Sequence, residues 1–140
     1  MKHMLVLLLP LLLLACEKDD PQPVSDCGPA ITISDLTDVP DSDPYVITAA
    51  NVEGLCLALT VQSTGCGSEG WTATLRTDGT IAESSPTQTA ARLILDRNDG
   101  DVICQAEISR DFTFDLTAYV ADALPTVLSL EETALAVTID

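Results

Sequence analysis

Apolar and polar residues alternate with a period of two along most of the chain after residue 30. The clearest run places an apolar side chain at every second position, at Leu55, Leu57, Leu59 and Val61. The same period recurs in segments 31–33, 45–52, 71–75, 91–95, 102–108, 112–116 and 135–139. Only the segment 118–123 has the pattern of a helical turn. Short strands at intervals of ~8–12 residues predict an all-β fold, an antiparallel β-sandwich of immunoglobulin-like architecture, with a barrel as the alternative.

Two turn signals are expected to join neighbouring strands as hairpins. Asn98, Asp99 and Gly100 separate segment 91–95 from segment 102–108, and Asp78-Gly79 follows segment 71–75. Asn-Gly and Asp-Gly pairs favour the tight turns that connect antiparallel strands. The sequence therefore predicts a hairpin at each of these positions.

The first 26 residues have a different pattern. Lys2 and His3 precede an aliphatic run over residues 4–15, which is too short to cross a hydrocarbon core of ~30 Å. A charged start, an apolar middle and small residues at the end predict a secretory signal peptide over residues 1–15. Residues 16–26 carry charges and prolines, which favour an extended tether. Residues 27–140 are then expected to form a single sandwich domain.

The boundary Leu13-Leu14-Ala15-Cys16 resembles the lipobox of bacterial lipoproteins, in which the chain is cut before the cysteine and its thiol is acylated. The resemblance implies lipid attachment at Cys16 and a membrane as partner; the alternative is an ordinary secretory signal. Residues 17–20, Glu-Lys-Asp-Asp, resemble the acidic export tag of surface lipoproteins in Bacteroidota-type bacteria. This implies a location at the outer membrane facing the cell exterior, with a periplasm-facing anchor as the alternative.

Four further cysteines predict two disulfides, because an oxidising compartment favours paired thiols and no Cys-x-x-Cys spacing indicates zinc. The strand pattern places Cys104 on the inward face and Cys56 on the outward face. Because Cys56 and Cys104 are expected on opposite faces, this face parity favours the pairs Cys66–Cys104 and Cys27–Cys56. The alternative joins Cys56 to Cys104 and Cys27 to Cys66, with Trp71 packed beside the bridge as in immunoglobulin domains. Each bridge closes a loop of a few dozen residues, which stabilises the fold by about 3–4 kcal/mol.

Charge excludes one class of partner. Removal of residues 1–15 leaves five Lys and Arg residues against 22 Asp and Glu, a net charge of −17. Nucleic acid requires a basic surface, so it is excluded as a partner, and an acidic ligand is disfavoured. We interpret the acidity as a solvated, self-repelling surface; the composition also resembles proteins adapted to high salt, and cation binding is the functional alternative.

The position of the one histidine limits the catalytic chemistry that the sequence predicts. The one histidine, His3, lies in the signal segment, so nucleophile systems that need an imidazole base and histidine-ligated metals are not expected, and no cofactor is predicted. A hydrolase that uses two carboxylates stays open as a minor hypothesis. Trp71 is interpreted as core, with sugar stacking as the alternative, and Phe112 and Phe114 are interpreted as core.

Calcium binding is the most specific ligand hypothesis that the sequence supports. Asp96, Asn98, Asp99 and Asp101 concentrate oxygen ligands in one turn, as hard cations require, and the acidic segment 35–43 is a candidate source of further ligands. The spacing is not that of an EF-hand. Ordinary turn chemistry, which favours Asn, Asp and Gly for backbone reasons, is the preferred interpretation.

Residues 64–67 (Thr-Gly-Cys-Gly), the segment Cys104-Gln105-Ala106 and residues 112–116 (Phe-Thr-Phe-Asp-Leu) together resemble a family of small Bacteroidota-type surface lipoproteins. The family is largely of unknown function, so the resemblance implies a cellular location and a fold but no activity. Trp71 stands where many members carry His, and no metal role transfers. The expected function is a non-enzymatic binding or accessory module at the cell envelope with an envelope protein or glycan as partner. The alternative is a calcium-stabilised adhesive or glycan-binding domain.

Overall fold

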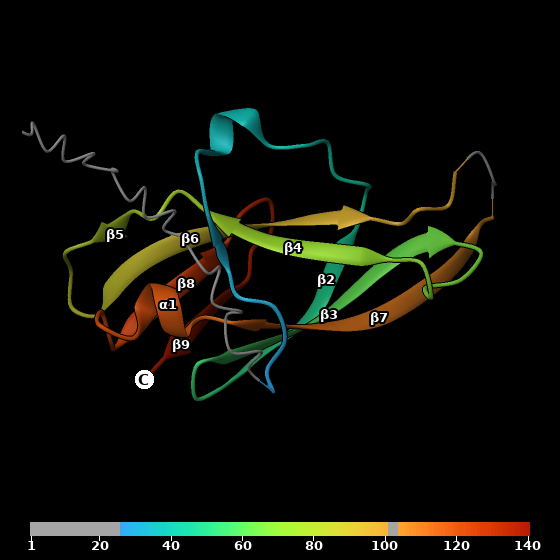
Figure 1. Cartoon of the computed structure of the whole chain (residues 1–140). Helices are drawn as coiled ribbons and strands as arrows, with labels where there is room; N and C mark the ends of the chain where they lie inside the picture. The colour runs from blue at the N-terminus through green and yellow to red at the C-terminus, as the bar shows by residue number, and fades with distance from the viewer. Residues whose placement is uncertain (1–25, 101–103) are drawn as a thin grey trace, which may run out of the picture.

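The computed structural model describes residues 26–100 and 104–140 and contains two β-sheets that pack face to face (Figure 1). The strands are β1 Thr32–Ile33, β2 Val46–Glu53, β3 Cys56–Gly65, β4 Thr72–Thr77, β5 Ile81–Ala82, β6 Thr87–Asp96, β7 Ala106–Asp115, β8 Thr126–Leu130 and β9 Ala136–Ile139. Two short helices accompany them, η1 Leu36–Asp38 and α1 Thr117–Val120. The predicted all-β sandwich is confirmed, as is the helical turn near residue 118. The signal segment, Cys16 and all but the last residue of the tether lie outside the described residues.

One sheet has the order β1-β4-β6-β8-β9, with β5 also paired to β6, and the other has the order β2-β3-β7. Most neighbours are antiparallel, but β1 runs parallel to β4 and β8 runs parallel to β6. Strand β8 was not expected from the sequence. Its five residues, Thr-Val-Leu-Ser-Leu, follow Pro125 and alternate between buried and more exposed positions.

The core lies between the two sheets. In β3 the side chains of Leu57, Leu59 and Val61 are at most 1% exposed, while the alternate residues Cys56, Ala58, Thr60 and Gln62 are partly exposed. The opposite sheet contributes fully buried leucines, Leu75, Leu93, Leu95 and Leu128. Each such leucine stabilises the fold by roughly 1.5–3 kcal/mol relative to an exposed one. The period-two pattern therefore sets which face of each sheet is buried.

A disulfide lies at each end of the central strand β3. Cys27 pairs with Cys56, the first residue of β3, and Cys66 pairs with Cys104 just beyond its last residue, with Cα–Cα distances of 5.5 and 5.0 Å. Two disulfides were predicted, and this is the pairing that face parity favoured. Cys56 lies on the outward face of β3, where the entry segment reaches it.

The predicted hairpin at Asn98-Asp99-Gly100 is wrong. Strand β6 pairs with β4, β5 and β8, whereas β7 pairs with all ten residues of β3, from Cys56↔Asp115 to Gly65↔Ala106. The connection after Asp96 thus crosses from one sheet to the other. A turn signal specifies a local bend and not the partner of the following strand, and both strands bury one alternating face in either arrangement.

The predicted hairpin at Asp78-Gly79 is also wrong. Strands β4 and β5 both run antiparallel to β6, so the chain continues in the same direction through an interruption. The Asp78 carboxylate accepts a hydrogen bond from the Thr80 N–H at 2.8 Å, and Gly79 has φ +83°. The turn chemistry is therefore present, but it produces a bulge, and the chain reverses between Ala82 and Thr87 instead.

Tyr119 of α1 forms hydrogen bonds on both sides of this interruption. Its hydroxyl accepts a hydrogen bond from the Thr77 hydroxyl at 2.9 Å, contacts the Thr89 hydroxyl, and donates to the Thr80 carbonyl at 3.3 Å. Tyr119, Thr77 and Thr89 are all buried. The network supplies partners for hydroxyls that would otherwise be costly to bury.

The entry segment joins the edges of the two sheets. Ile31 donates its N–H to the Asp115 carbonyl of β7 at 2.9 Å, and Thr32–Ile33 then pairs with β4 of the other sheet. In Figure 1 this segment climbs from the lower sheet to the upper one before it reaches η1. It thereby delivers the following residues, 36–45, to the outer side of β6.

Candidate functional site

Residues 36–45 form one wall of a cleft on the outer face of the larger sheet. The Asp43 N–H donates to the Leu95 carbonyl at 2.9 Å, and the Leu95 N–H donates to the Ser42 hydroxyl at 3.0 Å, which holds this segment against β6. Ile94 points away from the sandwich core and is still only 8% exposed. The segment therefore acts as a cover over the outer face of β6.

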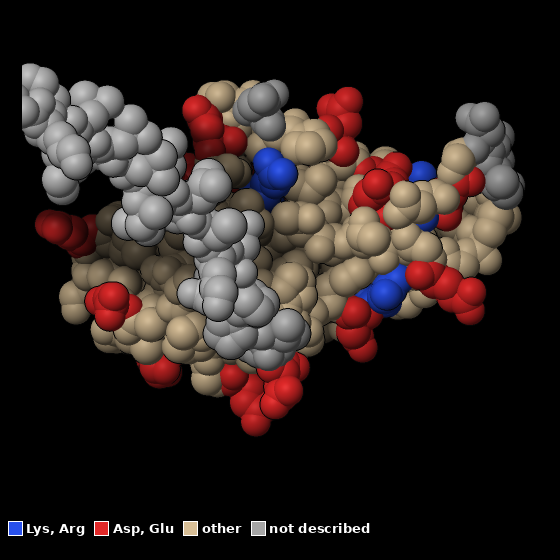
Figure 2. Space-filling model, in the orientation of Figure 1, with Lys and Arg blue, Asp and Glu red and all other residues tan. Residues whose placement is uncertain are grey.

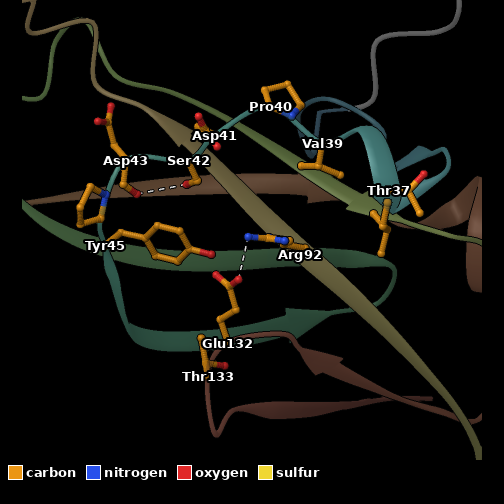
Figure 3. Close-up of a pocket in the computed structure, with 12 residues that line it drawn as sticks. Thr37, Val39, Pro40, Asp41, Ser42, Asp43, Tyr45, Arg92, Glu132 and Thr133 are labelled. Atoms are coloured by element: carbon orange, nitrogen blue, oxygen red, sulfur yellow. Dashed lines mark hydrogen bonds and ion pairs between the residues drawn. The ribbon is translucent and has the colours of Figure 1, made fainter.

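The cleft has a volume of about 540 Å³ and is lined by segment 36–45, by Arg92 of β6 and by Glu132 and Thr133 from the turn between β8 and β9. Figure 3 shows Arg92 between the covering segment on one side and Glu132 on the other, with the Tyr45 hydroxyl directed toward both. This volume lies within the range of ~300–1,000 Å³ that is common for small-molecule sites. Three elements far apart in the sequence thus meet at one polar cavity.

Two acidic residues of the cleft lining, Glu132 and Asp43, form ion pairs. Arg92 Nη2 lies 2.6 Å from Glu132 Oε1, and Arg97 Nη2 lies 3.4 Å from Asp43 Oδ1. A hydrogen bond from the Arg97 backbone N–H holds the pKa of the Asp43 carboxyl below its usual range, and the guanidinium acts in the same direction. Asp43 is therefore kept as an anion, opposite to what a general acid requires.

Tyr45 also lines the cleft, and its one O–H donor is already used. Its hydroxyl donates to the Leu93 carbonyl at 2.8 Å. Burial raises the pKa of the Tyr45 phenol, and the neighbouring Glu132 carboxylate raises it further. The phenol is therefore neutral near pH 7, and its oxygen retains lone pairs that can accept a hydrogen bond.

The calcium candidates have other partners where the structure describes them. Asp96 accepts from the Asn98 N–H at 2.9 Å, Asn98 donates its side-chain amide to the Gly70 carbonyl at 2.8 Å, and Asp99 lies 3.6 Å from Arg97. Asp101 lies outside the described residues. The two acidic segments approach each other, and Arg97 lies between Asp43 and Asp99 and supplies the positive charge. Within residues 26–100 and 104–140, no group of three or more Cys, Asp or Glu residues is arranged to hold a metal ion.

The aromatic residues are placed as core. Trp71 is 2% exposed and Phe114 is 1% exposed, while Phe112 is partly buried and packs on the core. These placements confirm the core interpretation for Trp71 and Phe114. Trp71 has no exposed ring face on which a sugar could stack.

Sequence patterns missed the residues of the cleft. Arg92 occupies a polar position within a strand that was predicted correctly, and Glu132 follows the strand that was not predicted. The one available signal was Arg92 itself, because arginine is infrequent in this acidic chain. Its juxtaposition with Tyr45 depends on tertiary packing, which no local period encodes.

The fold and its cleft define a disulfide-stapled all-β sandwich with a polar cavity on an outer face. Comparisons with protein-family models, with curated proteins and with solved structures find no match. No helix in the described part of the chain is long and apolar enough to cross a membrane. The resemblance to small surface lipoproteins stays a prediction.

Proposed function

We propose that this chain is a lipid-anchored protein of the bacterial cell envelope whose sandwich domain is a non-enzymatic binding module. The proposal rests on which cysteines form disulfides and which one does not. The four that follow residue 26 form two disulfides, at the two ends of β3. Of the five cysteines in the sequence, this leaves Cys16 for acylation at the lipobox-like boundary.

The disulfides also indicate the compartment. Bridges of this kind persist in the periplasm and at the cell surface and are rare in the cytosol. A domain held outside the cytoplasm by one acylated residue needs a spacer, and residues 17–26 contain charges and two prolines that favour an extended chain. We place the anchor at the outer membrane and the domain on the exterior, since residues 17–20 resemble an acidic export tag.

Metabolic labelling tests the anchor. Cells that express the full chain are fed an alkyne fatty acid, and the purified protein is coupled to a fluorophore. The proposal expects label on the wild-type protein and no label on Cys16→Ser, with Lys18→Gln as a matched control that keeps the label. Label that survives Cys16→Ser would refute the anchor.

Protease treatment of intact cells tests the orientation. A surface domain is degraded in whole cells, whereas a periplasm-facing one is degraded only after the outer membrane is opened. Replacing residues 17–20 by neutral residues is expected to protect the domain in whole cells without loss of label. Protection of the wild-type domain in whole cells would contradict surface display and leave the anchor intact.

A further inference from the structure

Positive charge is scarce in this protein, and three of the described arginines lie on or beside two neighbouring strands of the larger sheet. Figure 2 shows carboxylates spread over the visible face and few basic side chains. Of the four arginines within the described residues, Arg76, Arg92 and Arg97 lie on β4 and β6 or directly after β6. Arg76 and Arg92 are cross-strand partners, an arrangement of like charges that is destabilising by itself. Such local conflicts are expected at functional sites.

These arginines retain unused hydrogen-bond donors. The Nε atom of each of the three is buried without a hydrogen-bond partner. Buried donors are normally paired, so each one without a partner calls for an explanation. Arg92 is the one of the three that lines the cleft, and it directs its guanidinium toward Glu132 there (Figure 3).

Three carboxylates, those of Asp41, Asp43 and Glu132, and one guanidinium, that of Arg92, line the cleft. Glu132 is paired with Arg92, and Asp43 is paired with Arg97. Asp41 is the acidic residue of the lining for which the structure gives no partner. An anion would meet three carboxylates here, so the lining disfavours an anionic ligand. A ligand without negative charge that donates hydrogen bonds to the carboxylates and accepts them from Arg92 fits this lining.

The cleft also has apolar groups in its lining. Val39 and Pro40 precede the polar residues of the covering segment, and Pro44 and the ring of Tyr45 follow them. A pyranose presents the same combination, with C–H groups that pack on apolar and aromatic surfaces and hydroxyls that need donors and acceptors. Carboxylates accept from sugar hydroxyls, and guanidinium groups donate to them.

We infer that the cleft between segment 36–45, Arg92 and Glu132 binds a short neutral saccharide. Asp41 accepts hydrogen bonds from sugar hydroxyls, Arg92 donates to them, and Tyr45 packs against the ring. This inference rests on the proposed function as a binding module and names its ligand class. The lipid anchor is independent of it.

Calorimetric titration of the full chain tests the inference. The protein is extracted in a zwitterionic detergent that has no sugar headgroup, and neutral trisaccharides of glucose, mannose and galactose are the probes. At least one of them is expected to bind, and the matching uronic-acid trimers are expected to bind at least about tenfold more weakly. Failure of all three neutral probes, or equal binding of the uronic-acid trimers, would overturn the inference.

Single substitutions test whether the saccharide binds in this cleft. Asp41→Asn and Arg92→Gln are each expected to weaken binding about tenfold or more, since each removes a hydrogen bond to a charged group. Arg76→Gln is the matched control, because Arg76 faces Arg92 across the strand pair but does not line the cleft; it is expected to change affinity less than about twofold. Equal loss in Arg76→Gln and Arg92→Gln would place the ligand elsewhere. Acylation measured on the same samples reports the anchor separately, so loss of binding with intact acylation refutes the saccharide site alone.

Discussion

Removal of either disulfide is predicted to destabilise the domain by a similar amount. Cys27–Cys56 spans a sequence separation of 29 residues and Cys66–Cys104 spans 38. Loop-closure entropy in the unfolded chain then gives about 3.6 kcal/mol for the first bridge and about 3.9 kcal/mol for the second at 25 °C. The two loops differ little in length, and the stabilisation depends only on the logarithm of the loop length, so the two values are close. Each loss is a large part of the ~5–15 kcal/mol that stabilises an ordinary domain.

Urea unfolding measures these losses. The double variants Cys27→Ala with Cys56→Ala and Cys66→Ala with Cys104→Ala are compared with the oxidised wild-type protein, and fully reduced wild-type protein serves as the control that loses both contributions. The slope of unfolding free energy against urea concentration is expected to rise slightly as the unfolded chain expands. A double variant that retains stability within about 1 kcal/mol of the wild type, or losses that differ by more than about 2 kcal/mol, would refute loop closure as the main effect.

Three further predictions concern single residues. Tyr119→Phe leaves the buried Thr77 hydroxyl without one of its partners and is expected to lower the free energy of unfolding by about 1–3 kcal/mol in urea; a change below about 0.5 kcal/mol would contradict the network. The pKa of the Tyr45 phenol is raised in the folded state, so the neutral phenol stabilises the fold fully below pH ~10, and this stabilisation is lost as the pH rises through the folded pKa. Tyr45→Phe is therefore expected to reduce the fall in melting temperature at alkaline pH. An unchanged fall would contradict this. Gly28→Ala places a Cβ 2.6 Å from a β7 carbonyl oxygen at φ +112°, whereas Gly54→Ala at φ +60° meets no atom within 4 Å; the second is expected to cost about 1–2 kcal/mol and the first clearly more, and equal melting temperatures would contradict this.

Local sequence pattern was sufficient for most of the strands and for their buried faces. The alternation around Leu57 and Leu59 correctly placed both in the core, and the same parity placed Cys56 outward, where Cys27 reaches it. Those inferences depend only on the period of a strand, which neighbouring residues in the sequence encode.

Strand partners and the cleft could not be obtained in this way. Asp78-Gly79 and Asn98-Asp99-Gly100 have the residues of tight turns, but one forms a bulge along β6 and the other begins a crossing between sheets. Which strand lies beside which is decided by burial over the whole domain. The cleft depends on the same long-range packing, because Tyr45, Arg92 and Glu132 come from three separate segments.

We propose that Cys16 carries lipid while the other four cysteines are joined in pairs outside the cytoplasm. The decisive experiment is intact-mass spectrometry of protein isolated from cells under denaturing conditions, before and after reduction. We expect a chain that begins at Cys16, heavier than its polypeptide by fatty-acyl groups, which gains two hydrogen atoms for each of two disulfides on reduction. A chain that retains residues 1–15 without acyl groups would refute the lipid anchor, and one whose mass does not change on reduction would refute the disulfides.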